Sequence, residues 1–552
     1  MVLYIPPDLN TPFEKATIRE LRIGKLKPYK GLSITSGILK EPRDDAVFTN
    51  MTGLDGDEHD LTFHGGVDKA VHQYCSLHYS SWRSEFPASA ELFTVGGFGE
   101  NIVSEAMNER NVCIGDIIQI GSSEDGCLLQ VSLPRQPCYK LNHRFEIKGF
   151  ASHTWKNSRT GWYYRVLKEG RMRRGDPIVL VDRLHPRWTI ERIQEYLHRD
   201  GSSDIPVLKE LLAIPEFGAE CKRHFKHLIE IAETANEAKE PEIFSDFKLV
   251  EKIPQTPRIT SFVFEATNPE DSAEDIIPGG HVRLKLPNGL LRSYSLVDGT
   301  MHKFQLAIAL EDQSRGGSSY LHNTLKIRDT VQVGKATRSV PIVEGASNHI
   351  FIVGGIGITA FLPITKVFSR INFNYEFYYA VRSEEETPFK LELSAMQGNL
   401  TIYDGSKSQR MDIPSIISNR KWNSHVYVCG PQKMVDAVRA CNISDDEVHY
   451  EAFQAVRGGD PFTFSLKKDE DENAESRKRV FQVKEHETLL EVIRKQGLEV
   501  DSSCEVGNCA SCKVDVCAGK VEHRGSALSE KDKKGALLSC VSRGIGHLVI
   551  DF

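Results

Sequence analysis

The chain has 552 residues, of which 40% are hydrophobic and 26% are charged, so about three to five globular domains are expected and a disordered or fibrous protein is excluded. Its 69 Lys and Arg residues are outnumbered by 76 Asp and Glu residues, which argues against nucleic acid as the main partner, because neutralising phosphates needs a basic excess. The sequence contains no apolar run long enough to cross a membrane and no export signal at its start, so we expect a cytoplasmic protein without a membrane partner.

Residues 1–183 contain short β-type runs separated by Gly, Asp and Asn, a pattern that predicts a mostly β domain. Taken singly, its polar segments are not distinctive, since a lone histidine such as His64 is more often a core residue and a lone intracellular Cys is usually structural. These segments are Gly53-Leu-Asp-Gly-Asp57, His64-Gly-Gly-Val-Asp-Lys69, Gly96-Gly-Phe-Gly-Glu-Asn101, Arg135-Gln-Pro-Cys138 and Arg159-Thr-Gly-Trp-Tyr-Tyr-Arg165.

Together the segments resemble a MOSC domain of the bacterial hydroxylaminopurine-resistance kind, which has a barrel-like β fold. The resemblance implies a molybdenum cofactor, with the thiolate of Cys138 in the Arg-x-Pro-Cys segment as the molybdenum ligand. A soft thiolate suits molybdenum, but the residues alone do not name that metal. The resemblance also implies partners for the pterin phosphate and the substrate pocket, which motif position assigns to Lys69, Arg135, Asn142, His143 and Arg165.

Residues 184–235 change to a helical pattern. Ile190, Ile193 and Leu197 recur on one helical face, and Thr189 precedes them as an N-cap without the glutamate that would complete a capping box. The segment matches the small three-helix domain that follows MOSC in the same group of proteins. The acidic, Ala-rich stretch 230–241 then predicts a domain boundary.

From 243 to 338 the β pattern returns. Within it, Arg292-Ser-Tyr-Ser-Leu296 resembles the RxYS motif of the ferredoxin–NADP⁺ reductase superfamily, whose flavin lies on an antiparallel β-barrel. The resemblance implies that Arg292 pairs with the flavin phosphate, Tyr294 packs against the isoalloxazine and Ser295 reaches flavin N5. An exposed strand would often contain five such residues by chance.

A second segment, Ser314-Arg-Gly-Gly-Ser-Ser-Tyr-Leu-His322, strengthens the flavin interpretation. It places glycines and hydroxyls at the expected start of a helix, where backbone N–H groups bind anions. The alternative is a Gly-rich turn with a Ser N-cap. Because the two segments occur at a suitable separation, we favour a phosphate site that includes Arg315, Gly316, Gly317 and Ser318.

Residues 339–456 alternate strands and helices, as expected for a parallel α/β sheet. The turn Val353-Gly-Gly-Ile-Gly-Ile-Thr359 follows a strand, so the backbone at Gly354, Gly355, Gly357 and Thr359 is expected to approach a pyrophosphate, although the turn departs from GxGxxG. Val426-Tyr-Val-Cys-Gly-Pro431 resembles the superfamily's CGP motif, which implies that Cys429, followed by Gly430 and Pro431, lies beside the nicotinamide and the flavin. Otherwise Cys429 would be a buried strand thiol.

The end of this region also matches the superfamily, since Tyr450-Glu-Ala-Phe453 corresponds to its terminal segment and implies a cofactor contact for Phe453. Arg382 and Ser383 stand where the adenosine ribose would lie. The run Glu384–Glu386 follows at once and would repel a 2′-phosphate. We therefore favour NADH over NADPH.

Residues 460–552 form a small α+β unit around four cysteines. Cys504-x4-Cys509-x2-Cys512, followed by Cys540, has the plant-type [2Fe–2S] spacing. Zinc sites usually use two CxxC pairs, and only one is present here. The surrounding pattern, including a helix over 488–495, predicts a β-grasp ferredoxin domain, with Cys517 outside the ligand set.

Flavin barrel, nucleotide domain and ferredoxin, in that order, resemble phthalate dioxygenase reductase over residues 243–552. The resemblance implies FMN as the flavin, hydride transfer from NADH to its N5, and two single-electron steps to the cluster. Cys138, Cys429 and Ser295 are the residues expected at the reacting centres.

Two functions agree with these patterns. In the first, one chain carries electrons from NADH through FMN and [2Fe–2S] to a molybdenum centre that reduces small N-hydroxylated compounds. In the second, the C-terminal half delivers electrons to a separate electron-accepting protein, an oxygenase or cytochrome, while the MOSC half serves in cofactor binding or sulfur delivery. A MOSC domain that is only a structural adaptor would make Cys138 and its neighbours coincidental.

Overall fold

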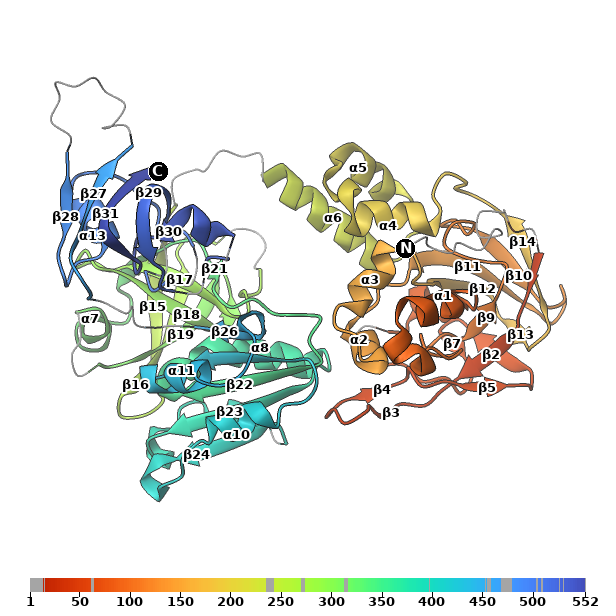
Figure 1. The fold of residues 1–552 in the computed structure, drawn as a ribbon. Helices are drawn as coiled ribbons and strands as arrows, with labels where there is room; N and C mark the ends of the chain where they lie inside the picture. Colours follow the sequence, from red (N-terminus) through yellow and green to blue (C-terminus); the bar gives the residue numbers. More distant parts are fainter. Residues whose placement is uncertain are drawn as a thin grey trace. The chain divides into compact units, whose positions relative to one another are not determined.

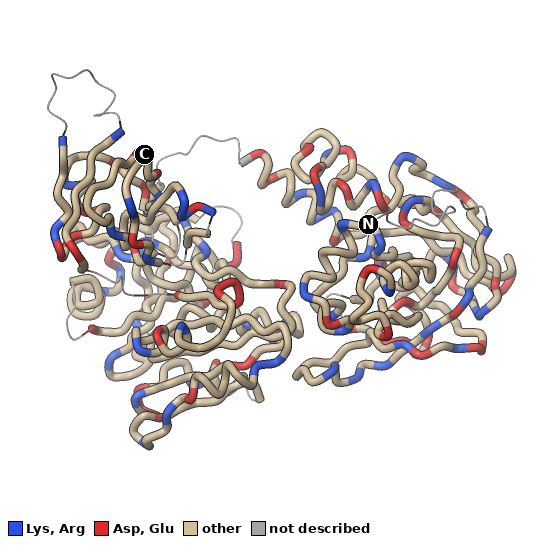
Figure 2. The backbone as a smooth tube through the Cα atoms, viewed as in Figure 1, with Lys and Arg blue, Asp and Glu red and all other residues tan. Residues whose placement is uncertain are grey.

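A computed structural model describes residues 13, 15–60, 64–234, 243–269, 274–311, 316–396, 398–451, 453, 458–467, 479–502, 505–507, 510–525, 527–529 and 531–551. The chain divides into two compact units (Figure 1). The first comprises residues 1–240 with the short segments 344–347 and 370–374, and the second comprises 241–343, 348–369 and 375–552. Basic and acidic residues are interspersed along the backbone of each unit (Figure 2).

The first unit is built on a nine-stranded sheet with the order β1-β14-β10-β11-β12-β8-β9-β2-β5. Its pairings are antiparallel except for β8 with β9. The bounds are β1 (Lys15–Thr17), β2 (Glu20–Ile23), β5 (Glu41–Arg43), β8 (Val71–Cys75), β9 (Ile102–Ser104), β10 (Ile117–Ile120), β11 (Cys127–Pro134), β12 (Trp162–Lys168) and β14 (Pro177–Asp182). A three-stranded sheet adds β6 (Val47–Asn50), β7 (Gly53–Leu54) and β13 (Gly170–Met172), and β3 (Lys27–Pro28) pairs with β4 (Thr35–Ser36). The prediction of a mostly β first part is confirmed.

An aromatic cluster fills the space between this sheet and three short helices. The helices are α1 (His78–Glu85), α2 (Tyr139–Phe145) and α3 (Phe150–Lys156). The cluster includes Trp82, Phe93, Phe98, Phe145 and Phe150, all buried, and the rings of Phe93 and Phe145 stack with centroids 4.3 Å apart. Large rings packed in this way fix the position of α2, which follows directly after Cys138.

The predicted helical part consists of α4 (Ile190–His198), α5 (Ile205–Ala213) and α6 (Ala219–Thr234), which lie together in Figure 1. Thr189 caps α4 by accepting the N–H of Arg192 at 3.2 Å, as its position in the sequence predicts. Ile190, Ile193 and Leu197 are buried in the same apolar core as the sheet residues Leu129 and Val131.

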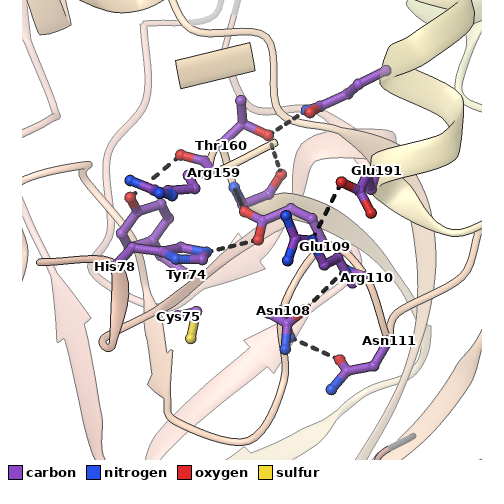
Figure 3. Close-up of polar contacts among 12 residues, drawn as sticks. Tyr74, Cys75, His78, Asn108, Glu109, Arg110, Asn111, Arg159, Thr160 and Glu191 are labelled. Atoms are coloured by element: carbon purple, nitrogen blue, oxygen red, sulfur yellow. Dashed lines mark hydrogen bonds and ion pairs between the residues drawn. The ribbon is translucent and has the colours of Figure 1, made fainter. Parts of the chain in front are cut away.

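Polar contacts also attach helix α4 to loops beside the sheet (Figure 3). Thr160, just before β12, accepts a hydrogen bond from the Gln194 amide of α4. Nε of Arg110 lies 3.3 Å from Oε1 of Glu191. These contacts involve side chains separated by 34 and 81 residues, so the helical part is docked on the sheet rather than tethered beside it.

The second unit begins with a closed barrel of six antiparallel strands in the order β18-β19-β16-β15-β20-β17, completed by pairing of β17 with β18. The strands are β15 (Ser245–Pro254), β16 (Ile259–Ala266), β17 (Gly280–Lys285), β18 (Leu291–Thr300), β19 (Lys303–Ala309) and β20 (Thr330–Val333), and β21 (Thr337–Arg338) pairs with β17 outside the ring. Phe262, Phe264, Val282, Leu284 and Leu306 fill its interior. This is the barrel that the sequence predicts.

A five-stranded parallel sheet follows, with the order β24-β23-β22-β25-β26. Its strands are β22 (Asn348–Gly354), β23 (Tyr375–Val381), β24 (Leu400–Asp404), β25 (Ser424–Cys429) and β26 (Val448–Tyr450), and its helices are α8 (Ile358–Arg370), α9 (Lys390–Ser394), α10 (Ile413–Ser418) and α11 (Gln432–Arg439). Because β22 and β25 are neighbours in a parallel sheet, the turns that follow them meet at the same edge.

The last part contains a five-stranded mixed sheet with the order β28-β27-β31-β29-β30 and the helix α13 (Leu489–Lys495). The strands are β27 (Phe462–Leu466), β28 (Phe481–Val483), β29 (Lys513–Glu522), β30 (Ala536–Leu538) and β31 (Arg543–Asp551). Thr488 and Glu491 form a capping box at the start of α13. Throughout the described ranges, no helix has both the length and the apolar character needed to cross a bilayer.

Candidate functional site

Cys138 lies at the edge of a cavity in the first unit. It follows the end of β11 and directly precedes α2, and its side chain is half-buried. The cavity is partly open to solvent and has about 50 Å³ of space for the centres of water-sized molecules. It is lined by Ser36, Gly37, Ile38, Lys40, Glu58, His59, Asp60, His64, Gly65, His72, Phe98, Gly99, Asn101, Arg135, Cys138, Lys140 and Tyr163.

Buried ion pairs stabilise the charged side chains of the cavity wall. Nζ of Lys40 contacts both oxygens of Asp57 at 2.5 Å. Asp57 also accepts hydrogen bonds from the Asn101 amide at 2.8 Å and the N–H of Gly24 at 2.7 Å. Burial lowers the pKa of Lys40 although Asp57 opposes the shift. On the same wall, Nζ of Lys140 lies 3.2 Å from Oδ2 of Asp60.

Two of the three histidines that line the cavity, His64 and His72, are uncharged near neutral pH. Burial lowers the pKa of His64 well below its ordinary value, and the positive charges of Lys140 and Lys69 lower it further. Burial and the nearby Arg135 have the same effect on the pKa of His72. Neutral imidazoles offer one donor and one acceptor each, so they suit hydrogen bonding to a polar ligand.

Nη1 of Arg135, a buried nitrogen atom of the wall, has no hydrogen-bond partner among the described residues. Buried polar atoms without partners are rare in folded proteins and often mark a place where a ligand binds. A thiol, a buried guanidinium and neighbouring lysines form a donor set that fits an anionic cofactor with a soft metal. The residues present therefore fit a molybdenum cofactor.

The other sequence-predicted partners lie elsewhere. Lys69 pairs with Glu220 of α6, and Arg165 of β12 binds Asp68 through Nη2 at 2.7 Å, so neither lines the cavity. Asn142 accepts the N–H of Ala151 at 2.6 Å, and Nε2 of His143 lies 2.9 Å from the carbonyl of Lys30. Motif position did not identify Lys40, Lys140 or His72 as residues of the cavity wall. For Lys140 alone, the sequence offered a signal, because this residue lies two positions after Cys138.

The two predicted flavin segments meet in the second unit. Arg292, Tyr294 and Ser295 lie in β18, and Gly317 begins helix α7 (Gly317–Asn323). A Cβ at Gly317 would stand 2.9 Å from Cγ and Nε of Arg292, so a glycine is needed for this approach. Gly316 has a φ of 87°, which also favours glycine. Ser318 is buried, and Arg315 lies outside the described residues.

The predicted glycine turn and the Cys-Gly-Pro segment also meet. Val353 pairs with Cys429 in the register of β22 and β25. A Cβ at Gly357 would stand 2.4 Å from the carbonyl oxygen of Cys429, and one at Gly354 would stand 2.6 Å from Cδ of Pro431. Gly430 also lies close to the turn, since a Cβ at this position would be 3.0 Å from the nitrogen of Gly354. The close contact leaves the turn's backbone, rather than side chains, facing a ligand.

The remaining residues predicted for the nucleotide site follow strands of the parallel sheet, at the edge where those strands end. Thr359, in the first turn of α8, donates to the carbonyl of Ile356 at 3.0 Å. Arg382 and Ser383 follow β23, and the carbonyl of Arg382 accepts the N–H of Ser406 at 2.8 Å. Cys429 is buried, and burial with the nearby Glu451 raises its thiol pKa. Gly355 has a φ of 52°, and Phe453 is 37% exposed.

Two of the predicted cluster cysteines are described and lie together. Sγ of Cys512 lies 3.1 Å from Sγ of Cys540, both buried against Leu490 and Leu538. Cys504 and Cys509 lie outside the described residues, and the remaining described residues hold no group of three or more His, Cys, Asp or Glu with metal-binding geometry. Positive φ angles at Gly507 and Ala510 bend the connecting loop. Cys512 comes from this tight loop and Cys540 from a distant segment, and their buried thiols converge. This arrangement fits the ligand set of a [2Fe–2S] cluster.

Comparison with known protein families agrees with this arrangement. Residues 60–179 match the MOSC domain, and residues 472–543 match the 2Fe-2S iron-sulfur cluster binding domain.

A reductase of Gibberella moniliformis is 36% identical over 550 residues, which cover 96% of this chain and 94% of that protein. The heme-dependent oxidative N-demethylase beta subunit of Ectopseudomonas mendocina is 34% identical over 53% of this chain and 94% of its own length. Phthalate dioxygenase reductase of Burkholderia cepacia is 31% identical over 52% of this chain and 92% of its own length.

The second half of the chain is therefore an oxidoreductase module for electron transfer, with flavin, NAD and [2Fe–2S] as its cofactors. The chain belongs to the family of the Gibberella moniliformis reductase, and it joins a MOSC domain to a reductase of the phthalate dioxygenase reductase family.

Proposed function

We propose that this chain uses NADH to reduce small N-hydroxylated compounds at a molybdenum centre held by Cys138. The observation that carries the proposal is the position of Cys138 on a cavity whose wall bears Arg135, Lys140 and the neutral histidines His64 and His72. The same chain holds a reductase module that supplies electrons. Joining donor and acceptor in one chain raises their effective concentration.

The overall reaction consumes one NADH and one proton for each nitrogen–oxygen bond. R–NHOH, NADH and H⁺ give R–NH₂, water and NAD⁺, so the two electrons of the hydride balance the N–O cleavage. A molybdenum centre bound to Cys138 would supply the two-electron chemistry that removes oxygen from nitrogen. Arg135 would hold an anionic part of the cofactor, because its buried guanidinium retains an unpartnered donor. His64 and His72 would hydrogen-bond the polar substrate in their neutral forms.

For the reductase half we propose FMN and NADH. Arg292 and Gly317 would bind the FMN phosphate, with Ser295 at flavin N5 and Cys429 beside the nicotinamide. The short contacts between Gly317 and Arg292 and between Gly357 and Cys429 support these roles. The exposed carboxylates of Glu384 and Glu385, directly after β23, support NADH because they would repel a 2′-phosphate.

The test is NADH oxidation after addition of a hydroxylamine or an amidoxime to molybdenum-replete protein. Cys138→Ala should abolish substrate-dependent NADH oxidation and leave NADH-dependent reduction of ferricyanide unchanged. Cys517→Ala is a matched control, because this exposed thiol lies outside the cavity. Equal turnover in the wild type and in Cys138→Ala would refute the proposal.

The relatives favour a second candidate, in which the electrons leave the chain for a separate protein. One relative is named as a subunit of an N-demethylase and another as the reductase of phthalate dioxygenase. In that case a chain without residues 1–235 should reduce cytochrome c as fast as the full chain, and no N-hydroxylated compound should accelerate NADH oxidation by the full chain. Substrate-dependent turnover that requires Cys138 would rule this candidate out.

A further inference from the structure

One side chain of the flavin barrel reaches the ferredoxin part just before its cluster cysteines. Nη1 of Arg283 donates a hydrogen bond to the backbone carbonyl of Ser502. The two residues are 219 positions apart in the chain, belong to the same compact unit, and are only 9% and 6% exposed. A hydrogen bond from a buried guanidinium is charge-assisted and is stronger than a neutral one.

At the barrel end, Arg283 is rigidly placed beside the flavin motif. It lies in β17 opposite Ser293 of β18, the residue between Arg292 and Tyr294. Its own carbonyl accepts the N–H of Gly334 at 2.9 Å. Its guanidinium lies 5.6 Å from the ring centre of Phe244, which adds a cation–π contact. The guanidinium is therefore fixed relative to the strand that carries the motif.

At the other end, Ser502 belongs to a polar network that flanks Cys504. Nη1 of Arg494, in α13, lies 2.8 Å from Oε1 of Glu505, and Nη2 of Arg494 donates to the hydroxyl of Ser502. The Ser502 hydroxyl donates to Glu505 at 3.1 Å. Ser502 and Glu505 are thus both bound to Arg494 of α13, and Arg283 connects this network to the barrel.

We propose that Arg283 is a positioning residue for electron transfer from the flavin to the [2Fe–2S] cluster. Electron tunnelling slows steeply with distance, so a buried contact between the barrel and the cysteine loop maintains the rate. The reduced flavin returns to its oxidised form by two one-electron transfers with release of two protons. Each transfer reduces one ferric iron of the cluster, which passes that electron to the acceptor before it takes the second. A buried positive charge also favours the reduced, more negative cluster and so raises its potential. This step precedes any final acceptor, so the inference does not depend on molybdenum.

The experiment follows a single turnover of the holoprotein with NADH in a stopped-flow instrument, and separates the absorbance of the flavin from that of the cluster. The variants are Arg283→Met, which removes the charge, and Arg283→Lys, which keeps the charge but loses the planar donor group. Lys285→Gln is the matched control, because Lys285 lies in the same strand, 5.9 Å from the ring centre of Phe244. A redox titration of the cluster, monitored by electron paramagnetic resonance, gives its midpoint potential.

We expect Arg283→Met to slow cluster reduction roughly tenfold or more, as small displacements of a reacting group do, with the rate of flavin reduction by NADH unchanged. Its cluster potential should become more negative. Arg283→Lys should keep the potential yet still slow cluster reduction, and Lys285→Gln should match the wild type. An unchanged cluster-reduction rate in Arg283→Lys would overturn the proposal. So would an equal loss of flavin reduction and cluster reduction in either variant.

Discussion

Nε2 of His78, in helix α1, lies 2.7 Å from Oε2 of Glu109, and both side chains are buried. Oε1 of Glu109 accepts the N–H of Gly161 at 2.7 Å, so one carboxylate joins α1 to the turn before β12 (Figure 3). Burial by itself raises the pKa of Glu109, but His78 and the Gly161 N–H outweigh burial and hold the pKa below its ordinary value. Glu109 is therefore a charged structural group in the folded protein.

This arrangement predicts acid sensitivity of the first unit. A carboxyl group with a lowered pKa contributes stability that is fully present above its unfolded pKa of 4.5 and is lost as the pH falls through the folded value. Glu109→Gln should lower the free energy of unfolding by about 2 kcal/mol at pH 7, because it removes the charged acceptor of two buried hydrogen bonds. The difference from the wild type should shrink below pH 4.5.

Urea unfolding of the full chain at several pH values, followed by tryptophan fluorescence, measures this effect, because four of the chain's five tryptophans lie in the first unit. Glu91→Gln is the control, because Glu91 is an exposed carboxylate of the same unit. A constant difference between Glu109→Gln and the wild type from pH 3 to pH 7 would contradict the linkage.

The contact between Gly357 and Cys429 predicts the effect of a single methyl group. Because a Cβ at Gly357 would stand 2.4 Å from a backbone oxygen, Gly357→Ala must displace the turn or the Cys-Gly-Pro segment. Overpacking of this kind costs about 1–3 kcal/mol. We expect slower reduction of the flavin by NADH, with normal cluster absorption. Gly535→Ala is the control, since a Cβ there meets open space, and wild-type kinetics in Gly357→Ala would be inconsistent with the structure.

The nucleotide site also predicts a change in cofactor preference. Glu384 and Glu385 begin the turn after β23, and Nζ of Lys407 lies 3.3 Å from Oε2 of Glu384. Replacing both glutamates by glutamine removes repulsion toward a 2′-phosphate and leaves Lys407 without this partner carboxylate. We expect kcat/KM for NADPH to rise about tenfold, which corresponds to 1.4 kcal/mol, with little change for NADH. Steady-state assays with ferricyanide test this, and Glu392→Gln is the control; a parallel change for both nucleotides would point away from phosphate repulsion.

The sequence predicted the elements that depend on local pattern. Alternating strands with glycine turns identified the β parts, and Thr189 marked the start of α4. Glycine and cysteine motifs also predicted which segments meet. A glycine is found where another segment comes close to the backbone, as the Arg292 side chain does at Gly317. Signals of the first kind depend only on neighbouring residues. Signals of the second kind depend on positions where few other residue types fit the backbone.

Partners of charged side chains were not predictable in the same way. Lys69 and Arg165 stand in motif-like segments, yet Glu220 and Asp68 are their partners. Lys40 lines the cavity instead. It does so because the segment that carries Lys40 precedes β5, at the edge of the nine-stranded sheet. Strand order, rather than spacing along the chain, decides which cations share a cavity. The contact of Arg283 with Ser502 depends on tertiary packing for the same reason.

The cavity itself predicts that Arg135 and Arg165 have different roles. Arg135 is 4% exposed, lines the cavity and keeps an unpartnered Nη1 among the described residues, whereas Arg165 binds Asp68 and Gln130. If the proposed molybdenum cofactor is bound here, Arg135→Met should lower the affinity for its pterin roughly tenfold or more, since the variant loses the buried positive charge that would pair with the anionic cofactor. Arg165→Met should leave pterin content unchanged and reduce stability instead. Pterin content per chain after dialysis, measured by fluorescence of the oxidised pterin with flavin absorbance as the reference, distinguishes the two. Loss of pterin in Arg165→Met alone would return the phosphate-binding role to Arg165.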